Sequence, residues 1–111
     1  MSVSKEASSL IRRPEFLIDA EHSYAIKMVG DTMSPRFRAD ERLYVDPDLK
    51  PENGWEHVFY SPDRRTAHVR TLLRYTAEHW IVEQLNPRKE GTLSKKAWPF
   101  CERIIGTHRP T

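Results

Sequence analysis

Apolar and polar residues alternate over short stretches along most of the chain, which is the pattern of half-buried β-strands. This pattern predicts six strands, at residues 23–29, 42–46, 57–60, 66–75, 80–85 and 100–109. Turn-forming residues separate them, as in the proline- and glycine-containing stretch "PDLKPENG". Strands of this length and spacing predict a mostly β domain with coiled sheets and a barrel-like core.

Two segments lack the strand pattern. Residues 1–12 are rich in Ser and Lys and predict a flexible lead-in to a domain over residues 13–111, although "SKEASSLIRR" also allows a short helix. Pro14 marks the entry into the ordered part, because the residue before a proline is driven towards extended geometry. Near the other end, "NPRKEGTLSKK" predicts a polar loop.

Composition and charge narrow the classes of protein. A chain of 111 residues with 38% hydrophobic and 31% charged residues fits one compact soluble domain. Its net charge of +2 comes from 18 basic and 16 acidic residues mixed along the chain, which is too weak a bias to indicate nucleic-acid binding by this segment. No apolar run is long enough for a membrane span, and "MSVSKEASS" lacks the apolar core of a secretion signal.

Cysteine and histidine positions do not predict a metal or cofactor site. The single cysteine, Cys101, excludes an internal disulfide, and a reducing cytoplasm is the default compartment. Because Cys101 lies in a predicted strand, we expect a small buried hydrophobe. The five histidines show no metal-ligand spacing and are interpreted as scattered surface residues, at positions 22, 57, 68, 79 and 108. The three tryptophans are interpreted as packing residues.

The stretch "VGDTMSPRF" places a hydroxyl residue, Thr32, directly after a Gly-Asp turn. A hydroxyl nucleophile needs a base, and a lysine with a lowered pKa can take its proton. Such pairs put the nucleophile after a turn and the lysine on a neighbouring strand. The alternative is a turn threonine whose hydroxyl bonds the local backbone.

Three ordered segments resemble the C-terminal domain of LexA-type and phage repressors, from about residue 13 to 109: "YAIKMVGDTMSPRFRADERLYVDP", "HVRTLLRYTAEHWIVEQLNP" and "RIIGTHR". In that family a Gly-Asp-Ser-Met-x-Pro turn carries a nucleophilic serine, a Val-Lys-Arg-Leu strand carries the lysine base, and Asn-Pro and Ile-Gly follow. The turn and loop motifs fall on Gly30, Asp31, Met33, Pro35, Asn86 and Pro87. The resemblance implies the coiled β-sheets of this family, which signal peptidases share.

Three departures from the family pattern predict that self-cleavage is lost. The serine position holds Thr32, whose extra methyl group crowds the approach to its hydroxyl. The lysine position holds Arg70, and a guanidinium with a pKa above about 12 is not a general base. No lysine lies on this strand, and the Ala-Gly or Cys-Gly dipeptide that the family cuts is absent from the sequence. We therefore interpret Thr32 and Arg70 as a vestigial dyad in which Arg70 donates towards Thr32, the alternative being an ordinary solvent-reaching arginine.

Dimerisation, the family's second activity, then becomes the leading function. The terminal strand "CERIIGTHR" is a candidate for pairing across a two-fold axis, with interface residues Arg103, Ile104, Ile105 and Gly106. The alternative is a closing strand buried within the monomer. The resemblance implies a cytoplasmic homodimer without cofactors, part of a prophage-type or SOS-response repressor.

The resemblance is compatible with several kinds of full-length protein. About 22 residues precede the first matched strand, too few for a helix-turn-helix domain. DNA binding is therefore expected only through such a domain outside this chain, with removal by an antirepressor protein as one route of induction. The alternatives are a free-standing protein similar to UmuD, a residual self-cleaving peptidase that uses Thr32, and, least favoured, direct DNA binding.

Overall fold

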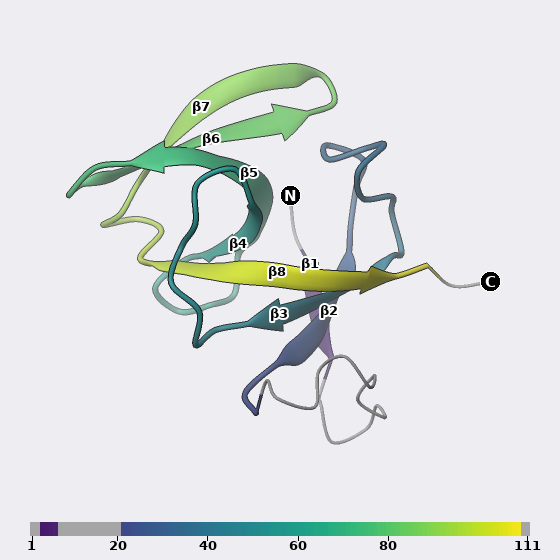
Figure 1. The fold of residues 1–111 in the computed structure, drawn as a ribbon. Helices are drawn as coiled ribbons and strands as arrows, with labels where there is room; N and C mark the ends of the chain where they lie inside the picture. Colours follow the sequence, from purple (N-terminus) through teal and green to yellow (C-terminus); the bar gives the residue numbers. More distant parts are fainter. Residues whose placement is uncertain (1–2, 7–20, 110–111) are drawn as a thin grey trace.

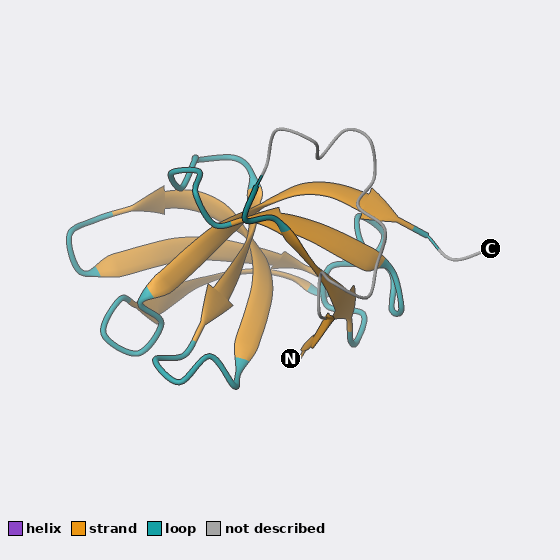
Figure 2. Ribbon diagram, turned by 90° about the horizontal axis from the view of Figure 1, so that it is seen from below, coloured by secondary structure: helices purple, strands orange, loops and turns teal. Residues whose placement is uncertain are grey.

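The computed structural model describes residues 3–6 and 21–109, and every regular element there is a β-strand (Figure 1). The strands are β1 (Val3–Glu6), β2 (Tyr24–Met28), β3 (Arg42–Asp46), β4 (Glu56–Tyr60), β5 (Ala67–Tyr75), β6 (His79–Leu85), β7 (Arg88–Ser94) and β8 (Phe100–His108). They form one antiparallel sheet in the order β1-β2-β3-β8-β4-β5-β6-β7. The mostly β prediction is confirmed. β1 and β7 are the two end strands of this order, and in the described part of the chain they do not pair with each other. The sheet is therefore coiled but is not a closed barrel (Figure 2).

Two strands form where the sequence pattern did not predict them. β7 occupies most of the expected polar loop, and it is an edge strand, where exposed side chains are compatible with a polar sequence. Leu85 pairs with Arg88, so only Asn86 and Pro87 form the turn between β6 and β7. β1 lies within the expected flexible lead-in and pairs with β2. The rest of that lead-in is outside the described residues.

β8 is an internal strand, so the expected exposed terminal strand is not what the structure shows. Phe100–Arg103 pair with β4, and Arg103–His108 pair with β3. This arrangement matches the alternative prediction of a closing strand within the monomer. Beyond Arg103, one backbone edge of β8 has no strand neighbour in the described part of the chain.

Three of the four expected interface residues are engaged within the monomer, and one of them, Ile105, packs against Ala25 and Tyr44. Ile104 is 5% exposed and belongs to the main hydrophobic core, which corrects its expected place on the surface. Arg103 lies with Nη1 3.2 Å from Glu52 Oε2, and its Nη2 donates to the Lys50 carbonyl. Arg103 therefore ties the loop before β4 to β8.

The sheet curls around one large hydrophobic cluster and carries two smaller ones, of which the smallest is Ala25 and Tyr44 with Ile105 packed against them. The large cluster comes from alternate positions of β2, β3, β4 and β5, together with Met33, Phe37 and Ile104. The other small cluster consists of Phe59, Leu72, Trp80 and Val82, with Trp98 and Cys101 packed against it. Cys101 is thus partly buried as expected, and burial raises the pKa of its thiol.

His57 is fully buried, which corrects its expected place on the surface. Its Nδ1 lies 2.8 Å from the Trp55 carbonyl and donates to it, because a carbonyl only accepts. Its Nε2 then accepts from the Glu52 amide, 3.2 Å away. A neutral ring satisfies both contacts, and burial lowers the pKa of His57 to about 4.

We expect His57 to make the fold acid-sensitive. The pKa of His57 is lower in the folded chain than in the unfolded chain, so the unfolded state binds more protons as the pH falls. The contribution of His57 to the stability of the folded state is therefore complete only above about pH 6.5. Between pH 7 and 4.5 this one histidine should remove about 2–3 kcal/mol from the free energy of unfolding.

Urea unfolding of the wild type and of His57→Gln at both pH values measures this loss. The variant should show a correspondingly flatter pH dependence. Replacement of the exposed His79 by Gln is the matched control and should leave the pH dependence unchanged. Equal slopes for the wild type and His57→Gln would refute the role of His57.

Candidate functional site

The Gly-Asp-Thr-Met turn is anchored from both sides. Gly30 has a φ of 86°, a left-handed conformation that favours glycine. After it, the Ser34 amide donates to the Asp31 carbonyl at 3.0 Å. Met33 is fully buried in the main core, and its carbonyl accepts from the Phe37 amide at 2.9 Å. The turn is therefore held by packing as well as by its own backbone bonds.

The turn also joins the end of β6, far away in sequence. The Thr32 carbonyl accepts from the amides of Leu85 and Asn86, both at 2.9 Å. Asn86 Nδ2 donates to the Asp31 carbonyl at 3.2 Å. The Asn-Pro motif and the Gly-Asp motif thus meet in space. Pro35 and Pro87 are exposed, and each follows a cis peptide bond.

Arg70 on β5 points towards Thr32, as expected from the sequence. Its Nη1 donates to the Val69 carbonyl at 2.8 Å and lies 3.5 Å from Thr32 Oγ1, at the long limit of a hydrogen bond. The β4–β5 pairing sets this direction, with Arg70 opposite His57 and Val69 turned into the main core. Both Thr32 and Arg70 are half-buried.

The direction of this contact matters for chemistry. The guanidinium gives a hydrogen bond and has no lone pair with which to accept the hydroxyl proton. Burial lowers the pKa of Arg70, yet arginine stays protonated in proteins. The pair can position the Thr32 hydroxyl but not deprotonate it.

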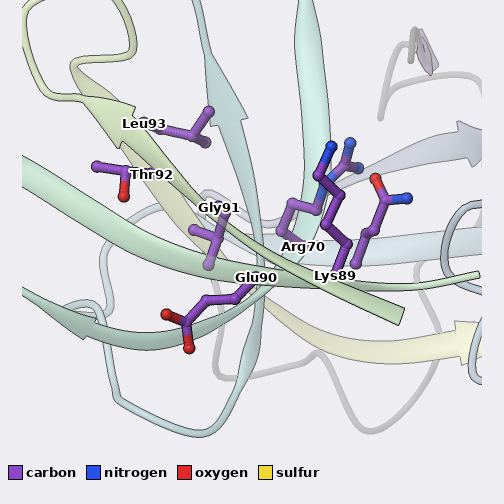
Figure 3. Close-up of a pocket in the computed structure, with 8 residues that line it drawn as sticks. Arg70, Lys89, Glu90, Gly91, Thr92 and Leu93 are labelled. Atoms are coloured by element: carbon purple, nitrogen blue, oxygen red, sulfur yellow. The ribbon is translucent and has the colours of Figure 1, made fainter. Parts of the chain in front are cut away.

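A groove of about 160 Å³ opens beside Arg70, on the face formed by β5, β6 and β7 (Figure 3). It is lined by Arg70, Val82, Gln84, Lys89, Glu90, Gly91, Thr92 and Leu93. Lys89 on β7 also lines this groove, although no lysine lies on the Arg70 strand. The sequence does not predict a place for Lys89 in this groove, because Lys89 belongs to β7 and the sequence pattern predicts a loop there.

Residues 3–6 and 21–109 contain no group of three histidine, cysteine or acidic side chains placed to bind a metal ion. Nor does this part of the chain contain a helix of the length and hydrophobicity needed to cross a membrane.

Comparison with known proteins adds two findings. Residues 2–102 match the family described as Peptidase S24-like. Repressor protein C of Rhizobium phage 16-3 is 26% identical over 102 residues, which cover 86% of this chain and 36% of that protein. The chain thus spans about a third of the length of this curated relative. No solved structure matches the chain.

Proposed function

The chain belongs to the Peptidase S24-like family, and on this premise we propose that it is the dimerisation and regulatory domain of a phage-type transcriptional repressor that has lost self-cleavage. The similarity to a phage repressor supports the regulatory role. In this proposal the turn and the strand of the ancestral peptidase remain, while their chemistry does not.

The observation that carries the loss of cleavage is the contact between Arg70 and Thr32. An arginine stands on the strand beside the hydroxyl, 3.5 Å from Oγ1, where a peptidase of this kind needs a base. A permanent cation cannot take the proton of an attacking hydroxyl. The Thr32–Arg70 pair therefore has a structural role rather than a catalytic one.

The dimer surface proposed here is the part of β8 beyond Arg103. Ile105 and Gly106 are partly exposed, unlike Ile104. One backbone edge of this stretch lacks a strand neighbour among the described residues, and an antiparallel copy across a two-fold axis would supply one. Among the four predicted interface residues, Ile105 and Gly106 are therefore the better candidates.

Sedimentation of the purified chain tests this dimer. We expect a homodimer at micromolar concentration, and an added charge beside the edge should weaken it by about tenfold or more because an unpaired charge is desolvated. Thr107→Arg introduces that charge on β8, and Thr92→Arg, at an exposed position of β7, is the matched control. A monomer at every concentration, or equal effects of the two variants, would refute the proposed surface.

DNA binding in this proposal belongs to a helix-turn-helix domain of a longer protein. Two such domains carried by a dimer grip paired half-sites, which explains why a repressor needs this domain. Release from DNA would then depend on a partner such as an antirepressor protein rather than on self-cleavage. A free-standing protein similar to UmuD is the alternative within the same family.

A further inference from the structure

Two of the residues that line the groove, Arg70 and Lys89, carry positive charges without an ion-pair partner among the described residues. Arg70 on β5 and Lys89 on β7 both line this groove, with Gln84 of β6 between the two strands, and Figure 3 shows Glu90 directed away from them. Within the described residues neither cation forms an ion pair. The nearest carboxylates on these strands are engaged elsewhere, Glu83 with Arg88 at 3.2 Å and Glu90 with Arg74 at 3.8 Å.

Several N–H donors of the Arg70 guanidinium make no hydrogen bond within the described residues. Only its Nη1 makes hydrogen bonds within the described residues, to the Val69 carbonyl and, at long range, to Thr32 Oγ1. Arg70 is half-buried and lines the groove. A guanidinium fork with a neighbouring ammonium matches the geometry and charge of an oxyanion.

The groove becomes apolar away from these cations. Pairing between β6 and β7 sets Gln84 opposite Lys89, Val82 opposite Gly91 and Trp80 opposite Leu93. Alternate residues of a strand share a face, so the groove runs from the cations over Gly91 to Leu93. A Cβ at Gly91 would meet no atom within 4 Å, so the missing side chain leaves the middle of the groove open.

We propose that this groove binds a small amphipathic oxyanion, with its acidic head between Arg70 and Lys89 and a short apolar tail over Gly91, Val82 and Leu93. The volume of about 160 Å³ has room for about five water-sized groups, which suits a short-chain organic acid. The site needs only the folded monomer, so it stands independently of the proposed dimer. It gives the vestigial cleft a ligand-binding role.

Titration of ¹⁵N-labelled chain with butyrate tests the site by NMR. We expect saturable shifts of the Lys89 and Gly91 amides and of Arg70 Nε, with a Kd on the order of 1 mM. Butyramide, which has nearly the same shape without the charge, and inorganic phosphate, which has a charge without the tail, should each bind about tenfold more weakly.

Variants locate the site. Arg70→Met and Lys89→Met should each weaken butyrate about tenfold by removing a charged partner, and Gly91→Leu should abolish binding by filling the groove. Lys50→Met removes an exposed charge outside the groove and is the matched control. If Arg70→Met does not fold, Lys89→Met and Gly91→Leu decide the question. Shifts that do not saturate, phosphate binding as tight as butyrate, or equal losses in Lys50→Met would overturn the proposal.

Discussion

Replacing Met33 by alanine should lower the free energy of unfolding by about 2–5 kcal/mol. The side chain is fully buried in the main core, although it belongs to a turn between strands. Its loss leaves a cavity that the surrounding strands fill only in part, and urea unfolding at neutral pH measures the cost.

Thr32→Ala is the matched variant, one residue away in the same turn. We expect a loss of only about 0.5–1.5 kcal/mol, because the bonds to Leu85 and Asn86 come from the backbone carbonyl and remain. A large loss at Met33 with a small one at Thr32 indicates that the turn is held by packing. Equal losses would show that the hydroxyl itself supports the fold.

Replacing Glu102 by alanine should cost about 3–5 kcal/mol of stability. Glu102 is 8% exposed and receives two hydrogen bonds from Arg64, both at 3.0 Å. The Tyr24 hydroxyl also donates to it and lies 2.8 Å from the Tyr60 hydroxyl. Burial raises the pKa of Tyr60 to about 12, although its hydrogen bond with Tyr24 acts in the opposite direction. Burial also raises the pKa of Tyr24, so both hydroxyls stay neutral at neutral pH. Without Glu102 a buried hydroxyl and a guanidinium lose their partner.

Thermal and urea unfolding measure this loss, with Glu90→Ala as the matched control. Glu90 pairs with Arg74 at 3.8 Å on the surface, where ion pairs contribute little, so its replacement should change stability by less than about 1 kcal/mol. A similar small effect at Glu102 would mean that the buried network does not stabilise the fold.

Local sequence pattern predicted those strands whose faces differ in burial. Arg42–Asp46 was predicted with its observed bounds, and β5 and β6 to within one residue, because alternation reports directly on a half-buried strand. β7 was missed because both of its faces are largely exposed, and an exposed edge imposes no alternation. The position of β8 within the sheet depends on pairing with β3 and β4, which no local pattern encodes.

Some residues of the candidate site were predictable from the sequence, and others depend on the pairing of distant strands. The resemblance to known repressors places Thr32 and Arg70 at the positions of the family's serine and lysine, and the structure brings the two side chains together. Lys89 could not be found in this way, because its proximity to Arg70 arises from the β5–β6–β7 pairing. Likewise, the sequence predicts a surface position for His57, because its two hydrogen-bond partners lie in a loop whose path no local pattern encodes.

The absence of self-cleavage is the central claim, and mass spectrometry after incubation at alkaline pH tests it most directly. The chain is incubated alone and with a peptide that contains an Ala-Gly bond. The double variant Thr32→Ser, Arg70→Lys restores the residue types of the active family and should cut the peptide, which makes it the positive control. The native chain is predicted to remain at full mass and to leave the peptide intact. A defined cut by the native chain that Thr32→Ala abolishes would contradict the account.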